Sequence, residues 1–450
     1  MDIQTILSSV LDEAYLPNEY PALAALEDEW TLNRPFEGLR VLVATPIYRN
    51  TMTQYRALLA GGAKLLVGFW GMNDGEIVEF LKDNGVPVVS PAEMLEAESR
   101  GEFVDLVLDC AGAFAGLHPK IGFVELTRSG VQHYNDAKKP VYVADSGIVK
   151  RIETSLGTGD GYFRALEKLG YGESFEGKRL LVFGSGKVGS GIALQGVRRG
   201  CNVTVVTDLK RAQSEQPVLS ENAENAANLE NAVNLENAEN AANLENAENA
   251  ANLENTANSA DSATPASEAL EKMPAGDFSA VLLQNGVDVV DCHDYETVSS
   301  LIYAADFVVT ATGVKYALAA PELQEPLLST AAILANMGVE DEYGEFLPAE
   351  RVLNNKGPLN FILEEPTHLK YIDTSLALHA ALAELLVQEV KSAASGERAT
   401  SEAVATSGNA MGLRFPPQEL EQRLLSIAIQ DGVIGPEVCD MLGIVPSDYD

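Results

Sequence analysis

The chain has 450 residues, of which 66 are acidic and 31 are basic, giving a formal net charge of −35. A chain of this length can bury more than one hydrophobic core, so we expect two or three domains. The negative charge repels nucleic-acid phosphates and anionic membrane surfaces, and no basic patch is visible in the sequence. These properties favour a small-molecule substrate and exclude nucleic acid and membrane as expected partners.

The apolar runs end before the roughly 20 residues that a membrane span needs, and the N-terminal residues lack a charged and then apolar export signal. We therefore expect a cytoplasmic protein. Its four cysteines, Cys110, Cys201, Cys292 and Cys439, form no CxxC pair, which indicates a reducing compartment. The sequence Cys292-His293-Asp294 precedes a predicted helix and has no further ligand at metal spacing, so no metal site is expected.

The first part of the chain alternates apolar runs with amphipathic segments, as an α/β domain does. A helix is predicted over residues 3–26. After it, strands are predicted at 41–48, 64–70, 86–90 and 106–112, with helices at 53–63 and 75–85. The expected organisation is an α/β domain at 1–150, a connecting helix at 151–176, a second α/β domain at 177–345 and a mainly helical C-terminal region at 346–450. The helices of this last region are expected after Leu376, and part of the region is expected to return to the first domain.

Residues 212–275 differ abruptly in composition from the rest of the chain. From Glu221 to Asn255 the words ENAENAANL and ENAVNL repeat, so the segment is of low complexity. It offers too little apolar surface to offset the entropy of ordering it. We expect a disordered or loosely helical surface insertion, and a partner-binding segment is the alternative.

A glycine-rich loop joins the predicted strand LLVF to a predicted helix. The spacing GxGxxG permits a tight turn, lets the backbone approach a pyrophosphate and allows the helix to pack closely on the strand. The next strand, NVTVVT, ends in an acidic residue at about the distance expected for a carboxylate that binds the ribose hydroxyls of NAD. A carboxylate there would repel the extra phosphate of NADP. The predicted NAD-binding residues are Gly184, Ser185, Gly186, Lys187, Val188, Gly189 and Asp208.

Two later strands of the same domain are predicted to end beside this loop, because the carboxyl ends of parallel strands meet at one edge of a sheet. The first is DFVVTATG and the second is AAILANMG. The additional cofactor contacts predicted from them are Thr310, Ala311, Thr312, Gly313, Asn336 and Gly338.

The order of several segments resembles adenosylhomocysteinase, the NAD-dependent enzyme that cleaves S-adenosylhomocysteine to adenosine and homocysteine. These segments are FEGLRVLVA, LVLDCAG, GFVELTRSGV, VADSG, the Gly184 loop, VTATG, ILANMG and FILEEP. The resemblance covers most of residues 36–380 apart from the repeats. It implies a Rossmann NAD-binding domain packed against a second α/β domain that binds the substrate. In that family NAD oxidises the ribose 3′-hydroxyl, homocysteine is eliminated, water is added and the hydride is returned.

The resemblance also implies site residues in the first domain. Thr127, Arg128 and Ser129 occupy the family's run of threonines that touches the cofactor. The candidate catalytic residues are Asp109, Cys110, Glu125, Lys150 and Glu153, where Lys150 matches the family's lysine only after a one-residue slip. The family's histidines and second acidic residues are replaced by Thr45-Pro46, Cys110, Leu126 and Val339, and its lysine by Val149 in a gapless comparison. Such replacements at proton-transfer positions cost orders of magnitude in rate.

Further residues could transfer protons. His118, His133 and His379 lie in segments that the resemblance places near the substrate, and a hydrogen-bonded structural role is the alternative for each. Cys110 follows a strand, and either an activated nucleophile or a buried inert thiol fits that position.

Three functions are compatible with these observations. The first is an NAD-binding relative of adenosylhomocysteinase with a degenerate hydrolase site and redox chemistry on a small hydroxyl-bearing substrate. The second is authentic adenosylhomocysteinase activity, and the third is non-catalytic NAD binding or sensing. D-2-hydroxyacid dehydrogenases share the domain plan, but their strand-end arginine and later glutamate and histidine are not recognisable. The C-terminal tail lacks the family's lysine and tyrosine, which leaves a homo-oligomer as an open alternative.

Overall fold

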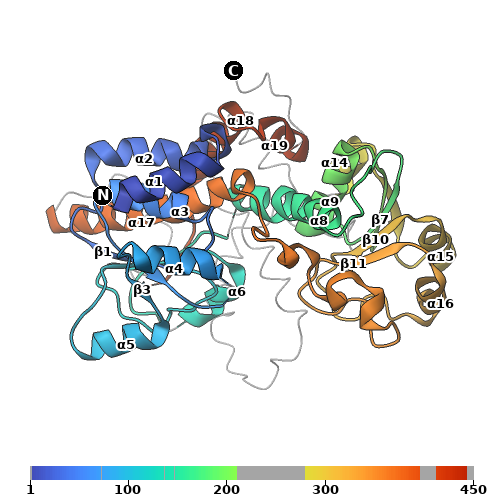
Figure 1. Ribbon diagram of the computed structural model, residues 1–450, viewed down its shortest axis with the longest axis horizontal. Helices are drawn as coiled ribbons and strands as arrows, with labels where there is room; N and C mark the ends of the chain where they lie inside the picture. Colours follow the sequence, from blue (N-terminus) through green and yellow to red (C-terminus); the bar gives the residue numbers. More distant parts are fainter. Residues whose placement is uncertain are drawn as a thin grey trace, which may run out of the picture. The chain divides into compact units, whose positions relative to one another are not determined.

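The computed structural model describes residues 3–71, 73–135, 137–145, 147–209, 279–395 and 412–442, so the expected insertion at 212–275 lies outside the described residues. The chain divides into two compact units (Figure 1). Unit 1 comprises residues 1–157 and 363–439, and unit 2 comprises residues 158–362 with a short C-terminal piece that begins at 440. The segment expected to connect two domains, 151–176, is divided between the units at Gly157, and residues 346–362 belong to unit 2.

Unit 1 is built on a seven-stranded sheet in which every neighbouring pair is parallel. Its strand order is β12-β6-β5-β4-β1-β2-β3. The strands are β1 Arg40–Val43, β2 Lys64–Gly68, β3 Val88–Val89, β4 Leu106–Asp109, β5 Gly122–Glu125, β6 Val141–Val143 and β12 Leu413–Arg414. The predicted strands therefore form, although each is shorter than its apolar run, because the strand ends turn into loops that carry polar residues.

The helices of unit 1 cover both faces of this sheet. They are α1 Ile3–Ala14, α2 Pro21–Asn33, α3 Met52–Ala60, α4 Gly75–Asp83, α5 Pro91–Ser99, α6 Arg128–Val131, α7 Val149–Arg151, α17 Leu369–Ser395, α18 Gln418–Gln430 and α19 Gly435–Leu442, with short turns η1 Pro17–Glu19 and η2 Gln132–Tyr134. A π-helix, η3, spans Ile152–Gly157. The C-terminal α17 packs against α2, η3 and β5, so segments distant in sequence share one core (Figure 1).

The predicted single helix over residues 3–26 is wrong, because two helices occupy this stretch. Pro17 opens η1 between α1 and α2, and Pro21 then occupies the first turn of α2, where a missing N–H is tolerated. The carboxylate of Asp373 on α17 accepts the Ala22 and Leu23 N–H groups at 2.8 and 3.0 Å. This buried carboxylate satisfies donors that the start of α2 would otherwise leave unpaired.

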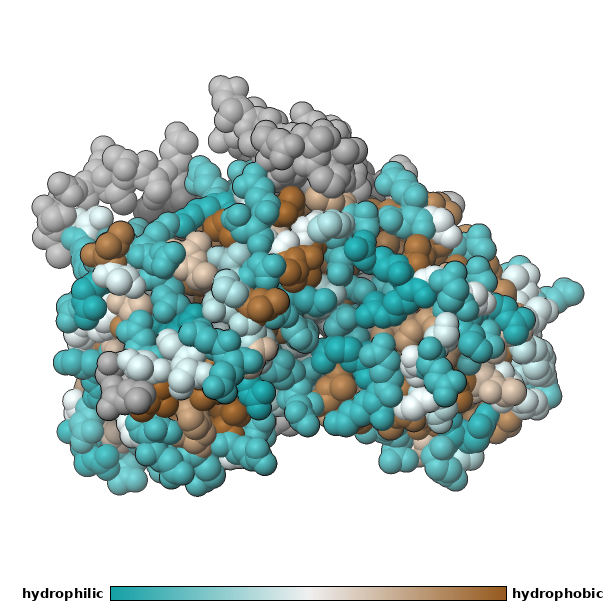
Figure 2. All heavy atoms as spheres, turned by 45° about the horizontal axis from the view of Figure 1, so that its top comes forward, coloured by the Kyte–Doolittle hydropathy of each residue, from teal (hydrophilic) through white to brown (hydrophobic). Residues whose placement is uncertain are grey.

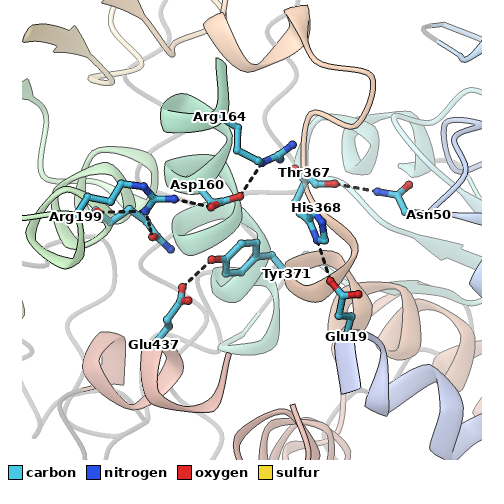
Figure 3. A network of polar contacts seen from close by, with 10 residues as sticks. Glu19, Asn50, Asp160, Arg164, Arg199, Thr367, His368, Tyr371 and Glu437 are labelled. Carbon is cyan, nitrogen blue, oxygen red and sulfur yellow. Dashed lines mark hydrogen bonds and ion pairs between the residues drawn. The ribbon is translucent and has the colours of Figure 1, made fainter. Parts of the chain in front are cut away.

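Polar contacts also tie the segment before α17 to the rest of unit 1 (Figure 3). The Asn50 side-chain amide donates to the Thr367 carbonyl at 2.9 Å, and the Tyr371 hydroxyl donates to Glu437 at 2.7 Å. Helix α17 begins at Leu369, earlier than the helical region expected after Leu376, and these contacts fix its first turn.

Unit 2 is built on a five-stranded parallel sheet of order β11-β10-β7-β8-β9. Helices α8, α9 and α14 lie on one face, and α15 and α16 lie on the other (Figure 1). The elements are α8 Thr158–Lys168, β7 Arg179–Phe183, α9 Lys187–Arg198, β8 Asn202–Thr207, α14 Ser279–Gln284, β9 Asp288–Asp291, α15 Tyr295–Ala304, β10 Phe307–Thr310, α16 Pro321–Ser329 and β11 Ile333–Asn336, followed by turns η5 Ala349–Arg351, η6 Leu353–Lys356 and η7 Leu359–Ile362. This is the expected Rossmann-type arrangement, with β7 in the middle.

An ion-pair network explains why α8 belongs to unit 2 and is no free connector (Figure 3). The Asp160 carboxylate on α8 accepts from Arg164 Nε and from Arg199 Nη2, both at 2.8 Å. Arg199 also lies over the ring of Phe163, with its guanidinium carbon 4.6 Å from the centroid. The charged groups of Asp160 and Arg199 are both partly removed from water, so this ion pair joins α8 to the end of α9.

Polar side chains cover most of the face drawn in Figure 2, and apolar residues gather there only in small separate patches. Among the described residues, no helix combines the length and apolar character that crossing a membrane requires.

Candidate functional site

The loops at the carboxyl edge of the unit 2 sheet meet where the strand order reverses. Strand β7 lies between β8 and β10, with Phe183 in register with both Val206 and Thr310. The chain therefore runs from β7 to β8 on one side and from β10 to β11 on the other, so a crevice opens at the carboxyl ends of β7 and β10. In doubly wound sheets ligands bind in this crevice, and the predicted glycine loop, Thr310 loop and Asn336 loop all reach it.

The three glycines of the loop after β7 meet three different geometric requirements. Gly184 has a φ of +109°, and a Cβ there would lie 2.4 Å from the Ala311 carbonyl oxygen. A Cβ on Gly189 would lie 2.0 Å from the Gly184 carbonyl oxygen, whereas one on Gly186 would meet nothing within 4 Å. The first glycine thus makes the turn, the third lets α9 approach the strand, and the second presents bare backbone to open space, as a dinucleotide loop does.

The start of α9 faces this open space. Gly186 is its N-cap and supplies no side-chain cap, so an anion at this helix start would meet backbone N–H groups and the positive end of the helix dipole. Ser185 and Ser190 stabilise the turn instead: Ser185 Oγ lies 2.8 Å from Thr207 Oγ1, and Ser190 Oγ donates to the Ser185 carbonyl at 2.6 Å. Asp208, partly exposed, follows β8 directly.

A buried glutamate that the sequence patterns do not reveal shapes the loop after β10. Glu342 is fully buried, and its carboxylate accepts the Thr312 N–H at 2.8 Å, the Thr312 hydroxyl at 2.8 Å and the Gly313 N–H at 2.7 Å. Burial raises the pKa of Glu342 above its usual range, although these donors oppose the shift. The run Glu340-Asp341-Glu342 has the composition of a solvated acidic turn, so only its position six residues after Asn336 could have hinted at this role.

The side chain of Asn336, at the end of β11, forms hydrogen bonds within its own loop. Its side-chain amide donates to the carbonyls of Gly338, Glu340 and Lys356 at 3.1, 2.7 and 2.6 Å, and its Oδ1 accepts from the Thr310 hydroxyl and the Gly338 N–H. The predicted cofactor residues Thr310 and Asn336 therefore bind each other, both fully buried. Val339, at the position of the family's histidine, is 88% exposed on the same loop.

The carboxyl edge of the unit 1 sheet carries the predicted catalytic residues, and Glu125 organises it. Its carboxylate accepts the backbone N–H groups of Ala111, Gly112 and Thr127 and the Thr127 hydroxyl, over 2.6–3.0 Å. Ala111 and Gly112 both have positive φ, 57° and 66°, a conformation that costs energy for alanine. Glu125 stabilises that turn by accepting hydrogen bonds from the N–H groups of the turn. Both carboxylate oxygens of Glu125 are therefore occupied by the loop after β4.

Asp109, in register with Glu125, holds the other side of the same loop. It accepts the Cys110 N–H at 2.8 Å, the Phe114 N–H at 2.9 Å and the Tyr134 hydroxyl at 2.5 Å. Burial, together with the charge of Glu125, raises the pKa of Asp109 to about 7. Asp109 is therefore a buried carboxyl group that changes protonation near neutral pH.

The buried Lys150 and the partly exposed Glu153 form an ion pair, with Nζ 2.8 Å from a carboxylate oxygen. Burial disfavours the ammonium form of Lys150, but the charges of Glu153 and Asp145 outweigh it and raise the lysine pKa. The nearby Cys110 thiol is buried, and burial with the charge of Glu125 raises its pKa well above the usual range. A neutral inert thiol therefore fits Cys110, and an activated nucleophile does not.

The residues after the ion pair form the π-helix η3, which has one more residue per turn than an α-helix. Such a turn shifts the facing of the side chains by one position. Val149 and Lys150 lie in the turn before η3, and both are buried.

The remaining sequence candidates have structural contacts. Thr127 Oγ1 donates to Glu125 and accepts the Ala111 N–H, while Ser129 is exposed and donates to Thr127; the side chain of Arg128 lies outside the described residues. His379 is buried, with Nε2 3.0 Å from the Val124 carbonyl and Nδ1 3.2 Å from the Gln54 amide, and burial lowers its pKa to about 3. His379 is thus a neutral structural histidine.

His118 and His133 are exposed, unlike His379. His118 is exposed and its Nδ1 lies 3.0 Å from Glu98. His133 packs over Gly112, whose Cβ would lie 2.5 Å from the imidazole. Of the two, only His133 contacts the loop that Glu125 holds. A hollow of about 240 Å³ opens elsewhere, at the amino ends of β7, β8 and β9, and no predicted site residue lines it.

Comparison with known proteins shows what the chain is similar to. No protein-family model matches the chain. Over 218 residues, 41% of this chain and 50% of the relative, the chain is 29% identical to the S-inosyl-L-homocysteine hydrolase of Methanopyrus kandleri. The chain thus spans about half the length of the curated relative that it matches.

Two solved structures are similar at low identity. The dipicolinate synthase of Bacillus halodurans matches with a TM-score of 0.41 and 12% identity, over 78% of this chain and 99% of that one. A transhydrogenase of Sinorhizobium meliloti matches with a TM-score of 0.38 and 13% identity, over 78% and 96% of the two chains.

We predict that Asp109 makes the stability of the protein depend on pH near neutrality. Its folded pKa of about 7 lies above the value of about 3.9 in an unfolded chain, so the folded state binds more protons between these values. Stability therefore falls as pH rises from 5 to 8. Asp109→Asn removes this term, so the free energy of unfolding of the wild type should drop by about 2 kcal/mol relative to the variant across that range, measured by urea denaturation.

Asp294→Asn is the matched control. Asp294 caps α15 at the surface, and its hydrogen bonds to Thr297 lower its pKa. This variant should differ from the wild type by a constant amount between pH 5 and 8. A constant difference for Asp109→Asn as well would show that Asp109 is ionised throughout.

Proposed function

We propose that this chain is a divergent adenosylhomocysteinase-like protein, that unit 2 binds NAD, and that the protein uses it for redox chemistry on a hydroxyl group of a small substrate. The observation that supports NAD binding is the loop Gly184–Gly189, whose bare Gly186 backbone and uncapped helix start face open space at the strand-order reversal. Backbone N–H groups and a helix N-terminus suit a pyrophosphate.

The residues that would hold the dinucleotide follow from this arrangement. Gly184, Ser185, Gly186, Lys187, Val188 and Gly189 would surround the pyrophosphate, and the Thr310–Gly313 loop would form the other wall of the crevice. Asp208 would accept hydrogen bonds from the adenosine ribose, which favours NAD over its phosphorylated form. NAD, when bound, supplies an acceptor for the hydride that leaves the substrate carbon.

The unit 1 residues are assigned roles by what their atoms already bind. Asp109 and Glu125 are positioning residues, because their oxygens hold the loop after β4. Glu153 is partly exposed, and we assign it the proton of the substrate hydroxyl, while the charged Lys150 orients it and stabilises negative charge on the oxygen. The replacements at Cys110, Leu126 and Val339 remove groups that the family's elimination and hydration steps would need.

Hydrolysis of a nucleosyl-homocysteine thioether is the second candidate. The relative from Methanopyrus kandleri bears the name of such a hydrolase. The Lys150–Glu153 pair preserves a lysine and an acid close to the family's positions. We rank this function second because a neutral thiol replaces the family's second aspartate, and an exposed valine replaces its histidine.

Gly186→Val tests NAD binding. A Cβ at Gly186 would meet no protein atom within 4 Å, and the backbone there, with φ −67° and ψ −175°, accepts any residue. We expect the variant to fold with an unchanged melting temperature and to bind NAD at least tenfold more weakly by calorimetry, since the isopropyl group occupies the space of the pyrophosphate.

Gly116→Ala is the control, because its Cβ would meet only the Leu95 side chain, 4.0 Å away, in unit 1. It should bind NAD as the wild type does. Equal affinities for NAD in Gly186→Val and the wild type would exclude this loop as the pyrophosphate site.

Product analysis separates the two candidate activities. We expect the purified protein to release no homocysteine from S-adenosylhomocysteine or S-inosylhomocysteine, and to reduce NAD with a member of a panel of small hydroxyl compounds. Glu153→Gln should slow that reduction by about 10²-fold or more, as loss of a proton acceptor does. Homocysteine release that Lys150→Met abolishes would establish the hydrolase instead.

A further inference from the structure

Three different metal-ligating groups lie together at the carboxyl end of β9. Asp291 ends the strand, and Cys292 and His293 follow it. One ligand atom from each, a carboxylate oxygen, Sγ and an imidazole nitrogen, lies within 4.8 Å of the other two. Cys292 Sγ is 3.4 Å from His293 Nδ1, and His293 Nδ1 is 3.0 Å from Asp291 Oδ1.

These separations are close to those around a tetrahedral metal ion. Zinc binds sulfur at about 2.3 Å and nitrogen or oxygen at about 2.0–2.2 Å, so neighbouring ligands of one ion lie roughly 3.3–3.6 Å apart. The sulfur–nitrogen pair already has this spacing, and the nitrogen–oxygen pair needs to open by only a few tenths of an ångström. The sulfur and the carboxylate oxygen, which lie within 4.8 Å of each other, would have to close to the same spacing.

The backbone that carries these groups is fixed on both sides. Thr207 of β8 pairs with Asp291, and the Cys292 N–H donates to the Thr207 carbonyl at 2.8 Å. On the other side Asp294 caps α15 through the Thr297 N–H. The sequence-based expectation of no metal rested on the absence of a further ligand beside Cys292-His293-Asp294; in the structure Asp294 caps the helix, and Asp291 lies beside Cys292 and His293.

The local charge favours a cation. The Cys292 thiol is partly buried, and the acidic residues Asp208 and Asp291 lie near it. A cation here would offset this negative charge and take the place of the thiol proton, which would leave to solvent.

We propose that Asp291, Cys292 and His293 form a binding site for a borderline-soft divalent cation of the zinc class. A thiolate, an imidazole and a carboxylate together suit zinc better than magnesium or calcium, which prefer oxygen ligands alone. Three protein ligands leave a fourth position for water. The proposal does not depend on what the Gly184 loop binds.

The test is a titration of tag-free full-length protein, stripped of metal by a chelator, with Zn²⁺ by calorimetry and with Co²⁺ by absorption spectroscopy. We expect one ion per chain and a thiolate-to-cobalt charge-transfer band. Cys292→Ser should remove the band, and Cys292→Ser and His293→Ala should each weaken Zn²⁺ binding at least tenfold, since loss of even an outer-sphere partner costs about 10–100-fold.

Cys201→Ser and His118→Ala are the matched controls, because they change a thiol and an imidazole at other places in the described chain. Both should bind Zn²⁺ and Co²⁺ as the wild type does. Gly186→Val should also bind Zn²⁺ normally, which separates this site from NAD binding. Cobalt spectra without a thiolate band, or Zn²⁺ affinity unchanged by Cys292→Ser, would overturn the proposal.

Discussion

The loops at both sheet edges depend on buried glutamates that accept backbone N–H groups. Glu125 binds donors of Ala111, Gly112 and Thr127 in unit 1, and Glu342 binds donors of Thr312 and Gly313 in unit 2. Each donor would cost about 1–3 kcal/mol if buried without a partner, and a buried carboxylate needs such donors to remain ionised. Loop and glutamate therefore require each other, and this pairing sets the shape of both candidate sites.

Because these glutamates are used to hold the loops, other side chains would have to transfer protons. A carboxylate whose oxygens hold a loop is poorly placed to exchange protons with a substrate, so Glu125 and Asp109 act as positioning residues. Glu153, in contrast, combines partial exposure with a charged partner, Lys150. The Gly184 loop requires no such side-chain chemistry, because glycines, backbone N–H groups and the start of α9 form it. The proposed NAD site therefore does not depend on proton-transfer groups in unit 1.

The parts of the molecule set by local rules were predictable. The glycine spacing, the strand before it and the strand NVTVVT are local patterns, and the structure has β7, α9 and β8 where they indicate. The break between α1 and α2 was also local, since Pro17 marks it, but the apolar spacing on both sides concealed it. Glu342 was not predictable, because its burial depends on the fold of the loops after both β10 and β11. The same holds for Asp291, which joins Cys292 and His293 only through the turn after β9.

We propose a protein that holds NAD and does not act as a hydrolase. Mass spectrometry of the protein isolated from cells under native conditions, followed by denaturation, identifies what the crevice retains. We expect NAD or its reduced form at up to one equivalent per chain, with no adenosine and no homocysteine. An adenosine-like compound beside the dinucleotide would contradict the loss of hydrolytic chemistry, and a crevice that retains a different nucleotide would contradict the account of the Gly184 loop.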